Sequence, residues 1–223
     1  KLKKSKLSNN LNKIAIKNMI IDKDNVLWVA TNGDGLFRFN LDNNRKSHFL
    51  KQNSKDKNTI NNNFVLDLFL DNVNNIWIGT DGGGLNLYEK KSGLFYSFQQ
   101  SFNNSSSISD NSIISIQSSI IIEDKNRNIW LSAGRDGLRK YNPTTKQLIS
   151  YIDNPKKQTD LNGNIVLALM EDTKDRIWIG TLRGGLNIYD TKSKKFLDIS
   201  DSKKLQRIYT IKKTKKGNIW VGS

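Results

Sequence analysis

The stretch DNVNNIWIGTDGGGLNLY, residues 71–88, decides the fold, because its pattern occurs four times in the chain and its first half occurs a fifth time. The five copies are centred on Trp28, Trp77, Trp130, Trp178 and Trp220. In the four full copies a glycine stands seven residues after the tryptophan, a leucine follows it at once, and an aromatic residue stands eleven after the tryptophan. These are Gly35, Gly84, Gly137 and Gly185, then Leu36, Leu85, Leu138 and Leu186, then Phe39, Tyr88, Tyr141 and Tyr189. Six residues before the tryptophan stand Asp22, Asp71, Asp124, Asp172 and, in the half copy, Thr214. No full copy needs a gap, and an internal repeat this regular predicts a repeat architecture.

Composition places the chain among globular proteins. Its 223 residues are 36% apolar, which suits one large all-β domain or two small ones. There is no apolar run long enough to cross a bilayer, so we expect no membrane contact by these residues. The opening residues KLKKSKLSNN are basic but lead into no apolar core, which predicts a secretory leader that is absent or already removed. With no cysteine, disulfides and thiolate metal sites are excluded.

The net charge of +15 raises nucleic acid as a partner. The lysines, however, are spread through turns and linkers and are not gathered on one face or interleaved with a fixed aromatic platform. We therefore interpret the charge as a solvated surface and expect no nucleic-acid partner. If a polyanion does bind, an acidic glycan is as good a candidate as DNA.

Each repeat reads as four short strands. The first strands, at 16–21, 64–70, 120–122 and 165–170, are apolar nearly throughout, which predicts inner strands covered on both faces. A tight turn follows, and its residue three before the tryptophan is Asn25, Asn74, Asp175 or Gly217, all types that tolerate a left-handed conformation; Arg127 is the exception. The second strand carries the tryptophan and the third begins at the Gly-Leu pair. The fourth strands are expected to end near Phe49, Phe98, Tyr151 and Ile199.

Four-stranded units that cannot bury their own two faces predict radial stacking into an all-β propeller. We expect one partial β-propeller over residues 1–223, with repeats at about 14–50, 64–99, 112–151 and 165–199 and a partial fifth at 207–223, as a fragment of a larger propeller. The third repeat has five extra residues within 112–120, so its inner strand bulges or its linker runs longer. Each indole is predicted to be a wedge between adjacent blades and not a carbohydrate platform.

The pattern D-x-x-x-x-[IL]-W-[IVL]-[GA]-T-x-x-G-G-L-x-x-[YF] resembles the two-component regulator propeller repeat. Copies such as DRIWIGTLRGGLNIYD carry the likeness, and together they cover nearly the whole chain. The resemblance implies a periplasmic or extracellular ligand-sensing propeller of a receptor of the hybrid two-component histidine kinase type found in Bacteroidetes. Such receptors continue into a β-sandwich, a membrane helix and a kinase core. None of the kinase or receiver motifs occurs within these 223 residues.

The inventory of catalytic groups is poor, so we expect no catalytic residue, no metal site and no cofactor. His48 is the only histidine and falls in an outer strand. The pairs Glu123-Asp124 and Glu171-Asp172 resemble acid/base couples, but both occupy hairpin entries, where an aspartate bonding its own turn is the simpler explanation. The DGGGL glycines lack the lysine and helix of a phosphate loop.

Propeller geometry says where a ligand would bind. The turns between second and third strands converge with the linkers between blades, while the strands are used for blade contacts. The candidate ligand-binding residues on that face are Asn32, Asp34, Asp81, Arg135, Asp136 and Arg183, which differ from copy to copy while their neighbours do not. Exposed turns that are free to drift would show the same variation, so both interpretations remain open.

The leading hypothesis is a non-enzymatic sensor segment. Its expected partners are an oligosaccharide, other domains of the same receptor and, in the intact protein, a second copy. Two alternatives remain: a propeller enzyme resembling streptogramin lyases or sialidases, and a purely structural or dimerising platform.

Overall fold

The computed structural model describes residues 11, 13–50, 58–98, 121–134, 137–153, 160–199 and 205–223, and every regular element in them is a β-strand. The first sheet contains β1 (Ile16–Ile21), β2 (Val26–Thr31), β3 (Leu36–Asn40) and β4 (Lys46–Phe49). The second contains β5 (Val65–Leu70), β6 (Ile76–Thr80), β7 (Gly84–Glu89) and β8 (Leu94–Phe98). The third contains β9 (Ile121–Glu123), β10 (Ile129–Ser132), β11 (Leu138–Asn142) and β12 (Gln147–Tyr151). The fourth contains β13 (Val166–Glu171), β14 (Arg176–Thr181), β15 (Leu186–Asp190) and β16 (Lys195–Leu197), and the fifth contains β17 (Thr210–Lys213) and β18 (Ile219–Gly222).

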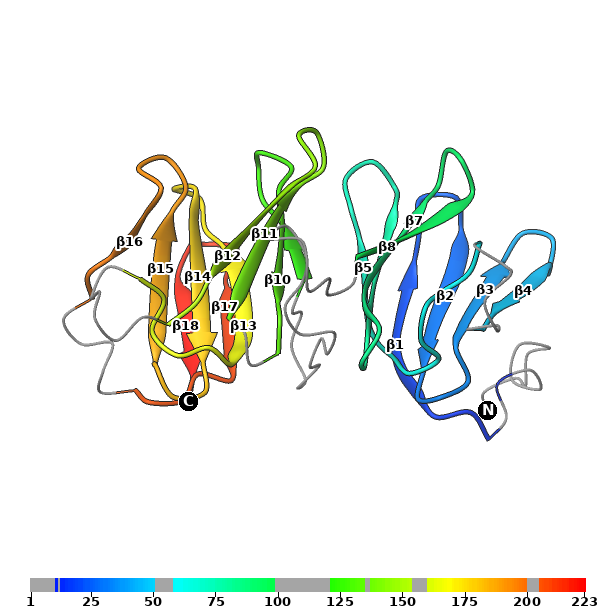
Figure 1. Cartoon of the computed structure of the whole chain (residues 1–223), viewed down its shortest axis with the longest axis horizontal. Helices are drawn as coiled ribbons and strands as arrows, with labels where there is room; N and C mark the ends of the chain where they lie inside the picture. The colour runs from blue at the N-terminus through cyan, green and yellow to red at the C-terminus, as the bar shows by residue number, and fades with distance from the viewer. Residues whose placement is uncertain are drawn as a thin grey trace, which may run out of the picture.

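Each sheet is an antiparallel meander whose strands pair in chain order. The sheets follow one another through the molecule, from β1–β4 at one end to β13–β18 at the other (Figure 1). Their first strands make the contacts between sheets, β1 with β5, β5 with β9, β9 with β13 and β13 with β17. The predicted all-β propeller, with four four-stranded blades and a partial fifth, is therefore confirmed. The five extra residues of the third repeat lie outside the described residues.

Aromatic clusters join consecutive sheets, as predicted for the tryptophans. Trp28 is fully buried and stacks with Phe49 of its own sheet, while its centroid lies 4.9 Å from that of Tyr88 in the next sheet. The same arrangement recurs at Trp77 with Phe98 and Tyr141, and at Trp130 with Tyr151 and Tyr189. Each cluster therefore takes its indole and one ring from one sheet and a third ring from the next, which holds the two sheets face to face.

The indoles of the last two sheets differ from the first three. Trp178 is half-buried against a cluster that includes Ile208 and Ile211 of the fifth sheet. Trp220 is 69% exposed, so the expectation that all five indoles act as wedges is wrong at this position. The physical reason is that no sheet of the described chain lies beyond β17–β18 to receive the ring.

The inner strands are also not all alike. Strand β13 is buried over most of its length, in keeping with an inner strand covered on both faces. Strand β1 is not: Met19 is 54% exposed and Ile21 is 56% exposed. This difference arises because β1 packs against β5 on one side and faces solvent on the other.

Left-handed residues set the turns of every repeat. Asn25, Asn74, Asp175 and Gly217 have positive φ angles, as predicted, and Arg127 has one too, at 66°. The turn conformation therefore persists in the third sheet in spite of an unfavourable residue type. A different position, the glycine seven residues after the tryptophan, is required by a close approach of the backbone. A Cβ on Gly137 would lie 2.2 Å from the carbonyl oxygen of Tyr151.

Candidate ligand-binding face

The meander gives the molecule two opposite ends, which we name by their connections. The hairpin face carries the turns between the first and second strands, at residues 22–25, 71–74, 124–127, 172–175 and 214–217. The loop face carries the turns between the second and third strands, together with the segments that lead into each inner strand. The two faces use their polar side chains differently.

On the hairpin face the recurrent aspartate organises its own turn and holds the indole. Asp124 Oδ1 accepts hydrogen bonds from the backbone amides of Asn126 and Asn128, both at 2.9 Å. Asp124 Oδ2 accepts one from Trp130 Nε1 at 2.7 Å. Asp22, Asp71 and Asp172 repeat this pattern, with indole bonds of 2.9, 3.1 and 2.9 Å. The hydrogen bonds within the turn were predicted from the sequence, whereas the hydrogen bond to the indole was not. The constant spacing of six residues between the aspartate and the tryptophan could have indicated it.

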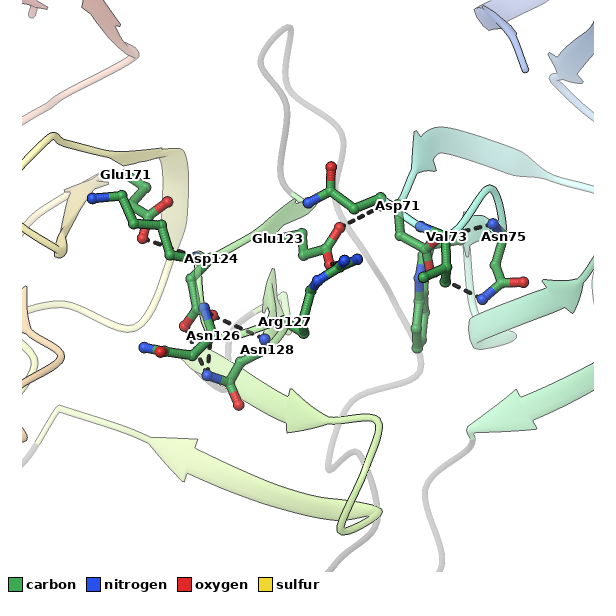
Figure 2. A network of polar contacts seen from close by, with 12 residues as sticks. Asp71, Val73, Asn75, Glu123, Asp124, Asn126, Arg127, Asn128 and Glu171 are labelled. Atoms are coloured by element: carbon green, nitrogen blue, oxygen red, sulfur yellow. Dashed lines mark hydrogen bonds and ion pairs between the residues drawn. The ribbon is translucent and has the colours of Figure 1, made fainter. Parts of the chain in front are cut away.

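The hairpins are also tied from sheet to sheet (Figure 2). The backbone amide of Asn72 donates to Glu123 Oε2 at 2.6 Å, and that of Lys125 donates to Glu171 Oε1 at 3.1 Å. In the first sheet the amide of Lys23 donates to Asn74 Oδ1 at 2.9 Å. In each case the donor belongs to one sheet and the acceptor to the next. These hydrogen bonds therefore link the hairpins of the first four sheets in order.

These contacts explain the two acidic pairs without catalysis. Burial acts to raise the pKa of Asp172, but hydrogen bonds from Trp178, Arg176 and the turn amides outweigh it and lower that pKa to about 2. Burial raises the pKa of the neighbouring Glu171 above its ordinary value, although the amide of Lys125 and the charge of its side chain oppose the shift. Both carboxyls are occupied by the scaffold, as are those of Glu123 and Asp124.

Hydrogen bonds hold the loop-face turns against the inner strands. The amides of Asn32, Asp81 and Leu182 donate to the carbonyls of Ala15, Phe64 and Ile165, at 2.8, 2.9 and 2.9 Å. The amides of Gly35 and Gly137 donate across to Asn63 and Asn164 of the next sheet, at 2.9 and 3.0 Å. The turns and the inner-strand lead-ins therefore do converge on one face.

The structure distributes the predicted site residues over three turns. Asn32 and Asp34 share the β2–β3 turn, Asp81 lies in the β6–β7 turn and Arg183 in the β14–β15 turn, and all four are exposed. Arg135 and Asp136 lie outside the described residues. His48 is exposed, lies 2.6 Å from the carbonyl oxygen of Asp34 through Nε2, and stacks on Phe37.

Arg183 is the predicted residue around which the surface is hollowed. One cavity of about 480 Å³ is lined by Asp153, Gly163, Asn164, Ile165, Leu182 and Arg183. A second, of about 350 Å³, is lined by Asp153, Asn162, Gly163, Arg183, Gly184, Gly185 and Gln206. Because both are lined by Asp153, Gly163 and Arg183, they adjoin. Asp153 and Arg183 nonetheless form no ion pair with each other or with any other described side chain.

A comparison of two equivalent asparagines shows how polar groups become available there. The side chain of Asn61 accepts a hydrogen bond from Asn86 at 2.9 Å and one from Thr80 at 3.4 Å. At Asn162 the backbone carbonyl takes both roles, accepting from Asn187 and Thr181 at 3.1 Å each. The side chain of Asn162 is thereby left without a hydrogen bond to any described residue. Sequence analysis missed this residue, because the two copies differ in geometry and not in residue type.

A further cavity of about 320 Å³ lies among the inner strands β5, β9, β13 and β17. Its lining includes Glu123, Glu171, Lys212 and Lys213 together with apolar side chains. The two glutamates already accept hydrogen bonds from backbone amides of the hairpin face. Their carboxylates are therefore engaged in contacts that hold the sheets together.

Sequence comparison identifies the repeat. Residues 59–82 and 160–183 match the two component regulator propeller family. These two segments are two-component regulator propeller repeats. Each matched regulator propeller segment begins at the lead-in of a sheet, runs through the inner strand and the aspartate hairpin, and ends just after the tryptophan strand. The resemblance stated from the motif is confirmed at these residues. No curated protein matches the chain in a sequence search.

Solved structures share the fold of this chain. The extracellular domain of BT3049 from B. thetaiotaomicron, described as a hybrid two component system, is 23% identical, with a TM-score of 0.69 over 96% of this chain and 26% of that one. The extracellular domain of BT4673 from the same organism is 22% identical, with a TM-score of 0.66 over 94% of this chain and 26% of that one. Virginiamycin B lyase from Staphylococcus aureus is 12% identical, with a TM-score of 0.62 over 95% of this chain and 64% of that one. The chain thus spans about a quarter of the two extracellular domains. No helix among the described residues has the length and apolar character to cross a bilayer.

Proposed function

We propose that this chain is a ligand-sensing, non-catalytic segment of an extracytoplasmic two-component receptor, and that its ligand is an oligosaccharide bound on the loop face. The regulator propeller repeats and the fold shared with extracellular domains of two-component systems support the sensor role. The choice of face follows from the contacts of the polar side chains: those of the hairpin face bond the scaffold, while several on the loop face make no hydrogen bond with a described residue.

The observation that carries the proposal is the pair of adjoining cavities around Arg183. Their rim combines a guanidinium, a carboxylate and side-chain amides that no described residue occupies. Such groups can donate to and accept from the many hydroxyls of a sugar, and a concave site with convergent polar groups is where a ligand is expected. Asn32, Asp34 and Asp81 extend the same face over the first two sheets, and Arg135 and Asp136 are proposed to do so in the third.

Calorimetric titration of the chain with plant and host glycan oligomers tests this proposal. We expect saturable heat with a subset of the oligomers, and loss of that heat in the Arg183→Ala variant. A panel that gives no heat, while a longer receptor containing this chain responds to one of its members, would place recognition elsewhere.

The fold shared with virginiamycin B lyase favours a second candidate, a propeller lyase. Incubation of the chain with virginiamycin B, followed by chromatography, tests it. Disappearance of the substrate would favour the lyase, and an unchanged peak would leave the sensor proposal in place.

A further inference from the structure

We propose that the loop face of the third to fifth sheets forms one groove for an acidic oligosaccharide, in which Arg183 and Arg207 bind uronic acid carboxylates and Tyr209 stacks on a sugar ring. This inference rests on the proposed function and deepens it by naming the class of sugar. It also extends the site into the fifth sheet, where sequence analysis placed no candidate residue.

The groove is continuous because its hollows share lining residues. Gln206, which lines the smaller cavity at Arg183, also lines a third hollow of about 530 Å³ together with Leu205, Arg207, Tyr209 and Ser223. The surface is therefore hollowed without a break from Asp153 and Arg183 through Gln206 to Tyr209. A path that crosses from the third sheet to the fifth suits an extended chain of sugars better than a single compact molecule.

The positive charge of the groove comes from two guanidinium groups that have no ion-pair partner in the part of the chain that the structure describes. Arg183 and Arg207 are exposed, and neither makes an ion pair with a described residue. On the hairpin face Arg176 is paired with Asp172 at 2.6 Å and Arg127 with Glu123 at 3.3 Å. Arg45 of that face is exposed and makes no ion pair with a described residue, but it lines none of the three hollows of the groove. A planar guanidinium presents parallel N–H groups that match the two oxygens of a carboxylate, so an unpaired pair of them along a groove favours an anionic ligand.

Tyr209 supplies a surface for a sugar ring. It is 44% exposed, although its backbone is fixed by a hydrogen bond from its amide to the carbonyl of Gly222 at 2.9 Å. The aromatic residues of the three clusters between sheets instead pack against one another. A rigidly held tyrosine with an apolar body and a polar tip is suited to the C–H-rich face of a sugar, with its hydroxyl left to bond at the edge.

The remaining polar groups match hydroxyls. The carboxylate of Asp153 and the side-chain amides of Asn162 and Gln206 make no hydrogen bond with a described residue. A carboxylate accepts and an amide both donates and accepts, so the three groups can satisfy hydroxyls on sugars whose acid groups are bound by the arginines.

The test is calorimetric titration of the chain, at low and at physiological salt, with three probes: an oligogalacturonate, the same oligomer with its carboxylates reduced to alcohols, and a sulfated oligosaccharide. Arg183→Gln, Arg207→Gln and Tyr209→Ala are compared with Arg45→Gln, which removes an exposed positive charge from the β3–β4 hairpin on the other face. All four positions are exposed, and unchanged thermal midpoints will show that the variants are folded.

We expect the oligogalacturonate to bind, the reduced oligomer to bind about tenfold or more weakly, and each groove variant to lose about tenfold in affinity while Arg45→Gln matches the wild type. Equal binding of the reduced oligomer, an equal loss in Arg45→Gln, or binding of the sulfated probe alone would overturn the inference while leaving an oligosaccharide sensor in place. Failure of all three probes, together with silence over the wider glycan panel, would overturn the proposed function as well.

Discussion

The two faces of this molecule are built from the same repeats, yet they differ in what their side chains do. On the hairpin face an aspartate at each full repeat bonds its own turn and an indole, and successive hairpins are tied to one another. On the loop face backbone amides hold the turns together with some side chains, such as Asn61 and Thr80. The side chains of Arg183, Asp153 and Asn162 make no hydrogen bond with a described residue. The hairpin face therefore supplies side-chain contacts that recur in every full repeat, whereas on the loop face some exposed side chains, such as Arg183, make no contact of this kind with a described residue.

The largest expected effect on stability comes from removing an indole that the hairpin aspartates hold. Trp77→Ala should lower the free energy of unfolding by about 3–5 kcal/mol, because it empties a buried site and leaves Asp71 without its indole partner. Trp220→Ala, at the exposed indole, should change it by less than about 0.5 kcal/mol. Urea unfolding of both variants decides, and equal losses would contradict the role assigned to the buried rings.

A smaller effect compares an aspartate from each face. Asp124→Ala should cost about 2–4 kcal/mol, because it leaves Trp130 Nε1 and the amide of Asn128 buried without an acceptor and removes the bond from the amide of Asn126. Asp34→Ala should cost less than about 0.5 kcal/mol, since its carboxylate lies exposed in a loop-face turn. Thermal or urea unfolding measures both. A loop-face loss as large as the hairpin-face loss would break the division between scaffold and recognition.

The same division explains how much could be read from the sequence. Residues that hold the scaffold recur at a constant spacing, which makes them recognisable in the sequence. The four-stranded sheets, the buried indoles and the left-handed turns were therefore all predicted. Exposure at the edges was not: Trp220 and Met19 carry the types of buried residues, and only the neighbours that a side chain meets in space decide its burial. The bond from the aspartate to the indole could have been found, since both residues recur at a fixed separation.

The candidate site stays a prediction. The sequence indicated the turns between the second and third strands, with Arg183 among them, because variation within a constant frame marks loops. It could not single out Asn162, whose side chain is left available because its backbone carbonyl accepts the bond that the side chain accepts at Asn61. It did not indicate Asp153 either. It also gave no reason to look at Arg207 and Tyr209, which lie at the start of the partial fifth repeat.

Acid titration gives a third way to separate the faces. Because the folded-state pKa of Asp172 is about 2 and its ordinary value is 3.8, its contribution to stability is fully present above about pH 4 and is lost as the pH falls toward 2. Asp172→Asn should therefore flatten the dependence of the unfolding midpoint on pH in this range. Asp34→Asn, on the loop face, is the matched control and should keep the wild-type slope. Parallel slopes for wild type and Asp172→Asn would contradict the prediction.

The smallest effect tests the one hairpin that departs from the rule. Arg127 has a φ of 66° where its counterparts are asparagine, aspartate or glycine. Arg127→Asn should raise the free energy of unfolding by about 0.5–1 kcal/mol, because asparagine tolerates this conformation better. The lost pair with Glu123 contributes little, since the arginine side chain is 53% exposed, although that of the glutamate is only 5% exposed. Urea unfolding measures the gain. A net loss would mean that the arginine's contact with Glu123 matters more than the strain of its backbone.

The exposure of Trp220 has a practical consequence. Three of the other indoles are sealed and the fourth is half-covered, so the emission of this one should be the most red-shifted and the first to be quenched by iodide. Anything that settles on the outer side of β18 would shift that signal to the blue and shield it from the quencher. The chain therefore contains an optical reporter for whatever borders its fifth sheet, and no label has to be added.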